Sequence, residues 1–173
     1  MAVWTNTATN TTGLSISPDW KKGLKITYGS TEGLLLNNTT FSQISGYFKN
    51  EDTADVLITA YYQDLGQLTT FGTATLPASE TNYELTFTGS QATITDEDFF
   101  VFFGGAANSG DVQLRVGYTG NLNTFKQEAA TPIYGNWSAY SDPPYYSPIS
   151  ITYTSPLPPS TGTRLPPPLI VRF

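Results

Sequence analysis

Paired carboxylates are the one arrangement in this sequence that could support acid–base catalysis. The 173 residues contain no histidine and no cysteine, which excludes imidazole bases, thiolate nucleophiles, disulfides and Cys-based zinc sites. Glycoside hydrolysis needs two carboxyl groups about 5–10 Å apart. Glu84 and Asp111 can be nominated, but Glu84 falls on the outward face of an expected strand and Asp111 at a strand entrance. We therefore expect no catalytic residues and no enzymatic activity.

Two further segments have a composition that could bind a ligand. The carboxylates of Asp96, Glu97 and Asp98 could bind calcium together with loop carbonyls, although their spacing is not that of an EF-hand. We interpret them as a solvated turn and keep calcium as the alternative. Residues 104–110 are glycine-rich but lack the Gly-Lys-Ser/Thr ending of a phosphate loop, so we expect a connection between strands. No cofactor is expected.

The charge balance limits the possible partners. The net charge is −6 and the 8 basic residues are scattered along the chain, so we expect no nucleic-acid partner. The longest apolar run, Phe99–Phe103, is far shorter than the ~20 residues of a membrane-spanning helix, and no membrane partner is expected.

Alternating apolar and polar residues predict the elements that would position any site. Val112–Tyr118 shows the cleanest alternation of a half-buried strand. The seven expected strands cover residues 24–28, 43–49, 56–62, 68–76, 82–88, 99–103 and 112–118. Short helices over 18–23 or 64–68 are the helical alternatives. The pattern predicts an all-β fold, an antiparallel, jelly-roll-like β-sandwich.

The ends of the chain differ in composition from this β-rich centre. Residues 1–20 read as a polar N-terminal arm, residues 21–131 as the sandwich, and residues 132–173 as an extended C-terminal arm rich in proline and tyrosine. Ten of the 12 prolines lie in the last segment. Proline cannot donate a ladder hydrogen bond, so this arm should run extended, partly as polyproline II. Within it, Ile149–Tyr153 could form one added strand.

Apolar side chains on both faces of two expected strands indicate a covered surface. Residues 57–62 and 99–103 are apolar on both faces, whereas an antiparallel sandwich strand needs only one buried face. Cover by the arms or by another subunit is the favoured interpretation, and a sugar-stacking platform with Tyr61 or Trp137 is the alternative. The expected contact residues are Trp4, Trp137, Tyr140, Tyr145, Tyr146, Leu169, Ile170 and Phe173.

The sequence also resembles two known kinds of protein. The segments Ser45–Asn50, Gly72–Pro77, Tyr83–Phe87 and Val112–Val116 together resemble the jelly roll of carbohydrate-binding modules. As a whole, the chain resembles bacteriophage capsid cement or decoration proteins, which combine a compact β-domain with extended arms and lack cysteine and a signal peptide.

The second resemblance implies a structural virion protein that is assembled in the host cytoplasm. Its partners would be the major capsid protein or other virion subunits, and it would form a homo-oligomer, either a dimer or a trimer. The alternative is a carbohydrate- or receptor-binding module of a tail fibre or adhesin.

Overall fold

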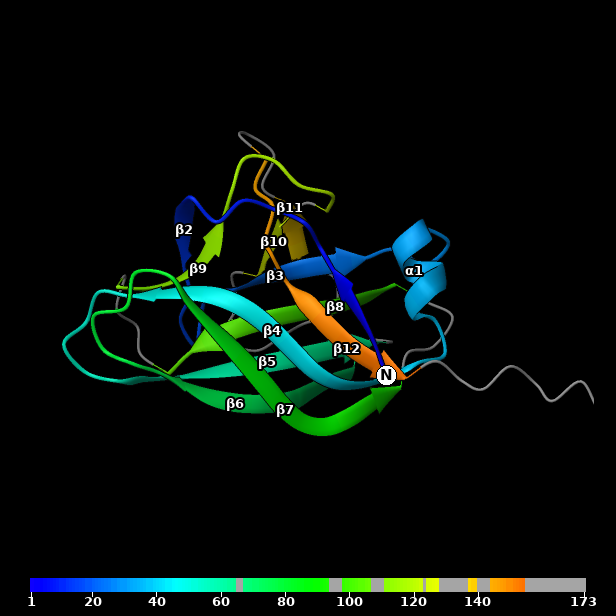
Figure 1. Ribbon diagram of the computed structural model, residues 1–173, viewed down its shortest axis with the longest axis horizontal. Helices are drawn as coiled ribbons and strands as arrows, with labels where there is room; N and C mark the ends of the chain where they lie inside the picture. Colours follow the sequence, from blue (N-terminus) through cyan, green and yellow to red (C-terminus); the bar gives the residue numbers. More distant parts are fainter. Residues whose placement is uncertain are drawn as a thin grey trace, which may run out of the picture.

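Two antiparallel sheets packed face to face form the protein, so the predicted all-β sandwich is confirmed (Figure 1). The computed structural model describes residues 1–64, 67–93, 98–106, 111–122, 124–127, 137–139 and 144–154. The first sheet contains β1 (Ala2–Thr5), β2 (Thr12–Ser15), β4 (Thr40–Asn50), β7 (Tyr83–Thr93), β9 (Val112–Val116) and β12 (Ser150–Thr154). The second contains β3 (Lys21–Ile26), β5 (Val56–Asp64), β6 (Gln67–Leu76), β8 (Phe99–Gly105), β10 (Thr124–Gln127) and β11 (Trp137–Ala139).

The long strand β4 organises the first sheet. β7 pairs with one of its edges, and the other edge is shared by two strands. β12 pairs with residues 40–45 of β4, and β9 pairs with residues 48–50. β1 continues the sheet beyond β12, and β2 continues it beyond β9. The sheet therefore forks beside β4 into a β12–β1 branch and a β9–β2 branch.

Phenylalanines from both sheets fill the space between them. Phe48 of β4 and Phe87 of β7 meet Phe103 of β8, with ring centroids 5.1 and 5.3 Å apart. Phe41 meets Phe99 in the same way at 5.9 Å. Edge-on and tilted aromatic pairs at these distances stabilise a core beyond the area that they bury. The inter-sheet core is therefore continuous from one end of β8 to the other.

Strand β8 is buried on both of its faces. Val101 and its alternate neighbours belong to the inter-sheet core, whereas Phe100 and Phe102 point to the opposite side and are still only 9% and 0% exposed. The Tyr61 ring stacks on Phe102 at 5.2 Å. The expected covering of this second face is thus present, and it is provided within a single chain.

The N-terminal residues are part of the sandwich, so the prediction of an extended arm over residues 1–20 is wrong. β1 and β2 are strands of the first sheet, and Trp4 and Ile16 lie in the core. Polar turn residues separate these two short strands. Each strand is therefore too short to show a clear alternation of apolar and polar residues in the sequence.

The boundary placed at residue 132 is also wrong for residues 144–154. The added strand expected at residues 149–153 exists as β12, but it lies between β1 and β4 inside the sheet. Ile149 and Ile151 are fully buried. This part of the proline-rich segment is therefore a component of the fold.

The short helix lies where the sequence did not predict one. β3 begins at Lys21, inside the helix considered for 18–23, and β6 begins at Gln67, inside the one considered for 64–68. α1 spans Thr31–Leu36, and the side chain of Ser30 caps its N-terminus by accepting a hydrogen bond from Gly33 N at 2.9 Å. Six residues are too few to show a helical period.

Candidate interaction surface

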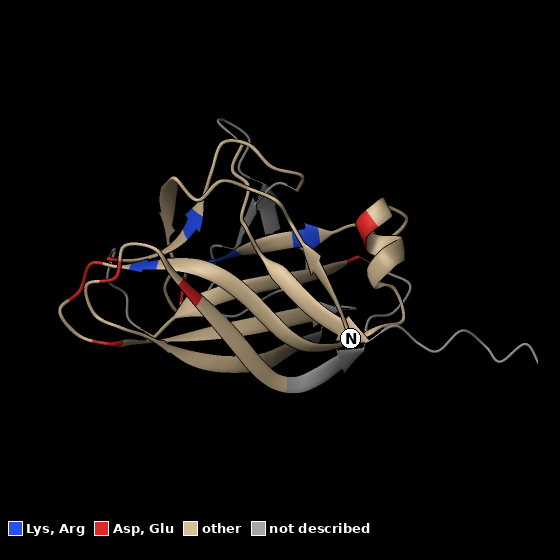
Figure 2. Cartoon of the chain, in the orientation of Figure 1, with Lys and Arg blue, Asp and Glu red and all other residues tan. Residues whose placement is uncertain are grey.

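One end of the sandwich is acidic (Figure 2). The connection between β4 and β5 carries Glu51, Asp52 and Asp55. Backbone hydrogen bonds bring two further acidic residues to this end. Asn50 N donates to Glu80 O at 2.7 Å, and Glu51 N donates to Asp111 O at 2.9 Å. We call this set of loops the acidic end, and its carboxylates favour contact with water.

The opposite end exposes apolar side chains. Tyr28, Leu34 and Leu35 are 44%, 62% and 48% exposed, and Met1 is 93% exposed. In Figure 1 the N-terminus and α1 lie toward the same end of the molecule, as does the C-terminal end of β12. We call Met1, Tyr28, Leu34 and Leu35 the α1 end.

Tight packing holds the helix against the sandwich at this end. Leu36 is fully buried in the core and fixes the last turn. A Cβ atom on Gly33 would lie 2.2 Å from the carbonyl oxygen of Thr27, so only glycine allows the helix to approach that backbone. Leu34 and Leu35 are consequently held on the solvent side of the helix.

An ion pair fixes the turn that presents Tyr28. Asp98 Oδ2 lies 2.6 Å from Lys25 Nζ, and Asp98 Oδ1 accepts the backbone N–H of Tyr28 at 2.8 Å. Partial burial acts to raise the pKa of Asp98, but the hydrogen bonds from Lys25 and Tyr28, together with the positive charge of Lys25, outweigh it and leave the pKa below its usual value. The turn is therefore tied to β3 by a carboxylate in its charged form.

These contacts also bear on the calcium alternative. The carboxylate of Asp98 is engaged by Lys25 and Tyr28, while residues 96 and 97 lie outside the described residues. Within the described ranges, no group of three or more acidic, histidine or cysteine side chains is placed to hold a metal ion.

Asn6 joins the two branches of the forked sheet. Its side chain is fully buried, and its Nδ2 donates to the carbonyl of Ser147 at 2.7 Å. Its Oδ1 accepts the backbone N–H of Leu122 at 3.1 Å, and its own N–H donates to Ile149 O at 2.9 Å. One side chain thus fixes three segments that are distant in the sequence.

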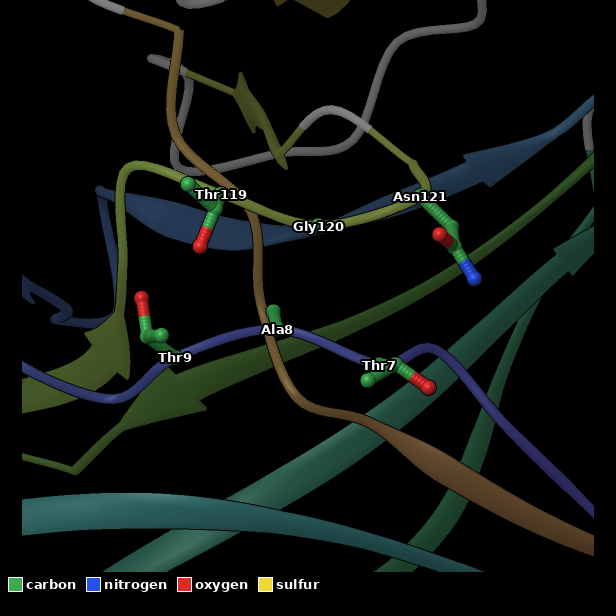
Figure 3. A pocket seen from close by; sticks show the side chains of 6 residues that line it. All are labelled: Thr7, Ala8, Thr9, Thr119, Gly120 and Asn121. Carbon is green, nitrogen blue, oxygen red and sulfur yellow. The ribbon is translucent and has the colours of Figure 1, made fainter.

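A shallow recess of about 280 Å³ opens beside this junction (Figure 3). Two backbone segments line it, and Thr9 N donates to Thr119 O across it at 3.3 Å. The lining residues are Thr7, Ala8, Thr9, Thr119, Gly120 and Asn121. Tyr118 directly precedes this lining, is 54% exposed, and has its ring 5.6 Å from that of Tyr145. Burial and the neighbouring Tyr118 raise the pKa of Tyr145.

The two carboxylates nominated for catalysis are not brought together. Glu84 lies opposite Tyr47 of β4, and it accepts the hydroxyl protons of Ser45 and Tyr47, both at 3.2 Å. Burial, followed by the charge of Glu84, raises the pKa of Tyr47. Asp111 lies on the other side of β4 beside Glu51, about 13 Å further along the strand at ~3.3 Å per residue. That separation exceeds the range of glycosidase carboxyl pairs.

The predicted contact residues lie in different environments in the structure. Trp4 is only 9% exposed and belongs to the core, so its assignment as an interface residue is wrong. Tyr145 and Tyr146 are half-buried and contact their own chain, the first beside Tyr118 and the second through a backbone bridge to Gly117. The side chain of Trp137 and all of Tyr140, Leu169, Ile170 and Phe173 lie outside the described residues.

Tyr61 is not the open platform that a sugar-stacking site requires. Its ring packs on Phe102, and Lys21 Nζ lies 5.9 Å from the ring centroid. Leu34 and Leu35 do expose apolar surface, and they were not among the predicted contact residues. Three consecutive leucines at 34–36 are the signal in the sequence, since a six-residue helix cannot bury all of them.

Comparison with known proteins adds no relative, so the fold alone defines the class of this protein. No protein-family model, curated protein or solved structure matches the chain. No helix among the described residues is long and apolar enough to cross a membrane. The chain is thus an all-β sandwich protein with a set of acidic loops at one end and exposed leucines on α1 at the other.

Proposed function

We propose that the protein is a structural virion protein, of the capsid cement or decoration kind, that docks on other virion subunits through its α1 end. The observation that carries this proposal is the pair of exposed leucines on a fixed helix at the α1 end. Leu34 and Leu35 expose adjacent apolar side chains on a capped, tightly packed helix, whereas the opposite end is acidic. Clustered exposed apolar groups mark contact surfaces.

The path of the chain after β12 also supports docking through the α1 end. β12 ends at Thr154 beside β1, since Tyr153 pairs with Ala2. The 19 residues that follow, 155–173, therefore start from the α1 end and include eight apolar residues or prolines in their last nine positions, 165–173. The acidic end would then face solvent.

Binding to particles tests this proposal. The double variant Leu34→Ser, Leu35→Ser should bind virion shells that lack the protein at least tenfold more weakly, because two apolar anchors of roughly 1.5 kcal/mol or more each are lost. The measurement is co-sedimentation of the purified protein with such particles. The variant should keep the circular dichroism spectrum of the parent, because neither side chain belongs to the buried core.

Leu57→Ser is the matched control. Leu57 is 46% exposed on β5, next to the acidic end, and its replacement should leave particle binding within twofold of the parent. Equal binding by the double variant and the parent would contradict docking through the α1 end. Equal losses in the double variant and in Leu57→Ser would contradict the assignment of this particular surface.

Carbohydrate or receptor binding is the second candidate, and one observation favours it. The exposed ring of Tyr118 adjoins a recess whose rim offers threonine hydroxyls and the Asn121 amide, a combination suited to stacking and hydrogen bonding with a sugar. A glycan array should then give a specific hit that Tyr118→Ala abolishes and Tyr83→Ala, at an exposed tyrosine on β7, retains. An array without hits, or a hit insensitive to Tyr118→Ala, would dismiss this candidate.

A further inference from the structure

β1 forms the edge of the forked first sheet. It pairs with β12 on one side, and the described residues place no strand on its other side. Asn6 N donates to Ile149 O, so Asn6, Trp4 and Ala2 are the residues whose backbone groups face β12. Because this orientation alternates along an antiparallel strand, the N–H and C=O groups of Val3 and Thr5 point to the open edge.

Apart from being only four residues long, this edge lacks the features that usually prevent strand addition. Proteins protect an exposed edge with charged side chains, proline or a bulge. Ala2–Thr5 contains no charged residue and no proline, and its pairing with β12 is in register throughout. Val3 is 65% exposed, while Trp4 lies against the core below it. An unprotected edge with apolar side chains is a template for another strand.

The sequence after β12 contains a segment suited to this edge. Leu169–Phe173 is a proline-free run of Leu, Ile, Val, Arg and Phe, residues that pack well on a sheet apart from the single arginine. In a strand, Leu169, Val171 and Phe173 would share one apolar face. That face could extend the layer of Trp4 and Ile151, leaving Ile170 and Arg172 beside Val3.

The spacer before this segment favours a neighbouring molecule. Residues 155–168 contain six prolines, at positions 156, 158, 159 and 166–168. A 14-residue segment wholly in polyproline II, at about 3.1 Å per residue, would reach roughly 43 Å. The spacer starts next to Ala2 of its own β1, and its two proline clusters favour an extended path that would bring Leu169–Phe173 within reach of a neighbouring copy.

We propose that Leu169–Phe173 of one copy adds as a strand to the open edge of β1 in a second copy of this chain. Main-chain hydrogen bonds to Val3 and Thr5 would supply affinity, and the alternate side chains would supply the register. The exchange can be reciprocal between two copies related by a two-fold axis, which gives a closed dimer. This inference does not depend on the proposed function, because it concerns the isolated protein.

Proline substitution tests the edge directly. Val3→Pro removes an N–H that points away from β12 and leaves the β1–β12 ladder intact, as proline is tolerated on strand edges. Sedimentation velocity over a range of concentrations should show a dimer for the parent. The dissociation constant for self-association should rise at least tenfold in Val3→Pro and in the segment variant Ile170→Pro.

Val3→Thr is the matched control, because it keeps the edge N–H and the β-branched shape. It should dimerise within about threefold of the parent. A parent protein that is monomeric at every concentration would overturn the proposal, as would a dimer that both proline variants retain. Dimer loss in Val3→Pro alone, with Ile170→Pro unaffected, would overturn the assignment of Leu169–Phe173 as the added strand.

Discussion

A chain truncated after residue 143 should fail to fold, whereas a chain truncated after residue 154 should fold as the full-length protein does. The two differ by the segment that contains β12. Ile149 and Ile151 are 0% exposed and Tyr153 is 5% exposed. Burial of three such side chains contributes roughly 5–9 kcal/mol, which is comparable to the ~5–15 kcal/mol stability of a whole domain.

The loss also reaches beyond these side chains. Without β12, β1 has no pairing partner in the sheet, and Trp4 loses its neighbour Ile151. Asn6 loses the short bond from its side-chain amide to Ser147 O and the bond from its backbone N–H to Ile149 O, and an unsatisfied buried donor costs about 1–3 kcal/mol. Near-ultraviolet circular dichroism and thermal melting of the two truncated chains will distinguish the outcomes. A cooperative transition in the shorter chain, close to that of the longer one, would show that β12 is not integral.

This result would separate two parts of the C-terminal segment that look alike by composition. Proline content extends from residue 132 to residue 168, and it predicts a single extended arm. The alternation at Ile149, Ile151 and Tyr153 is the competing signal, and in the structure it determines the fold of residues 149–154. A short strand pattern inside a proline-rich segment is therefore evidence for a built-in strand.

The central strands could be predicted because their own side chains specify them. β5, β6, β8 and β9 follow the expected segments to within three residues, since the first three are rich in β-branched or aromatic residues and β9 alternates apolar and polar residues. β1 and β2 could not, because four residues between polar turns show no distinctive period. β1 acquires its structure from β12, about 150 positions later in the chain, and no local pattern records that pairing.

The contact surface was harder to predict than the fold for a related reason. Trp4 and Leu34 are both large apolar residues in segments that look exposed, yet Trp4 is 9% and Leu34 62% exposed. The difference comes from how each segment packs. Strand pairing turns Trp4 inward beside Ile151, whereas Leu34 follows a glycine that packs against the Thr27 backbone and therefore faces solvent. Both facts depend on long-range packing, which the side-chain types alone do not specify.

Gly89→Ala is expected to destabilise the protein by about 3 kcal/mol or more, because β6 and β7 approach each other backbone to backbone at this residue. The ladder between β5 and β6 skips Phe71, which forms a bulge between Thr70 and Gly72. A Cβ on Gly89 would lie only 1.2 Å from the Phe71 carbonyl oxygen, and a Cβ on Gly72 2.8 Å from that of Thr88. Neither obstacle is a flexible side chain that could move aside.

Thermal unfolding of the folded protein measures this effect. A loss of about 3 kcal/mol lowers the melting temperature of a chain of this size by roughly 6–12 °C. Thr86→Ala, at an exposed position on the same strand, is the control and should cost below about 1 kcal/mol. If the melting temperature of Gly89→Ala equals that of the control, β6 and β7 can move apart at little cost in free energy. The two sheets would then be less tightly packed along these strands than the close approach of Gly89 and Phe71 implies. If it melts far below the control, this backbone contact joins the two sheets directly, in addition to the side-chain core between them.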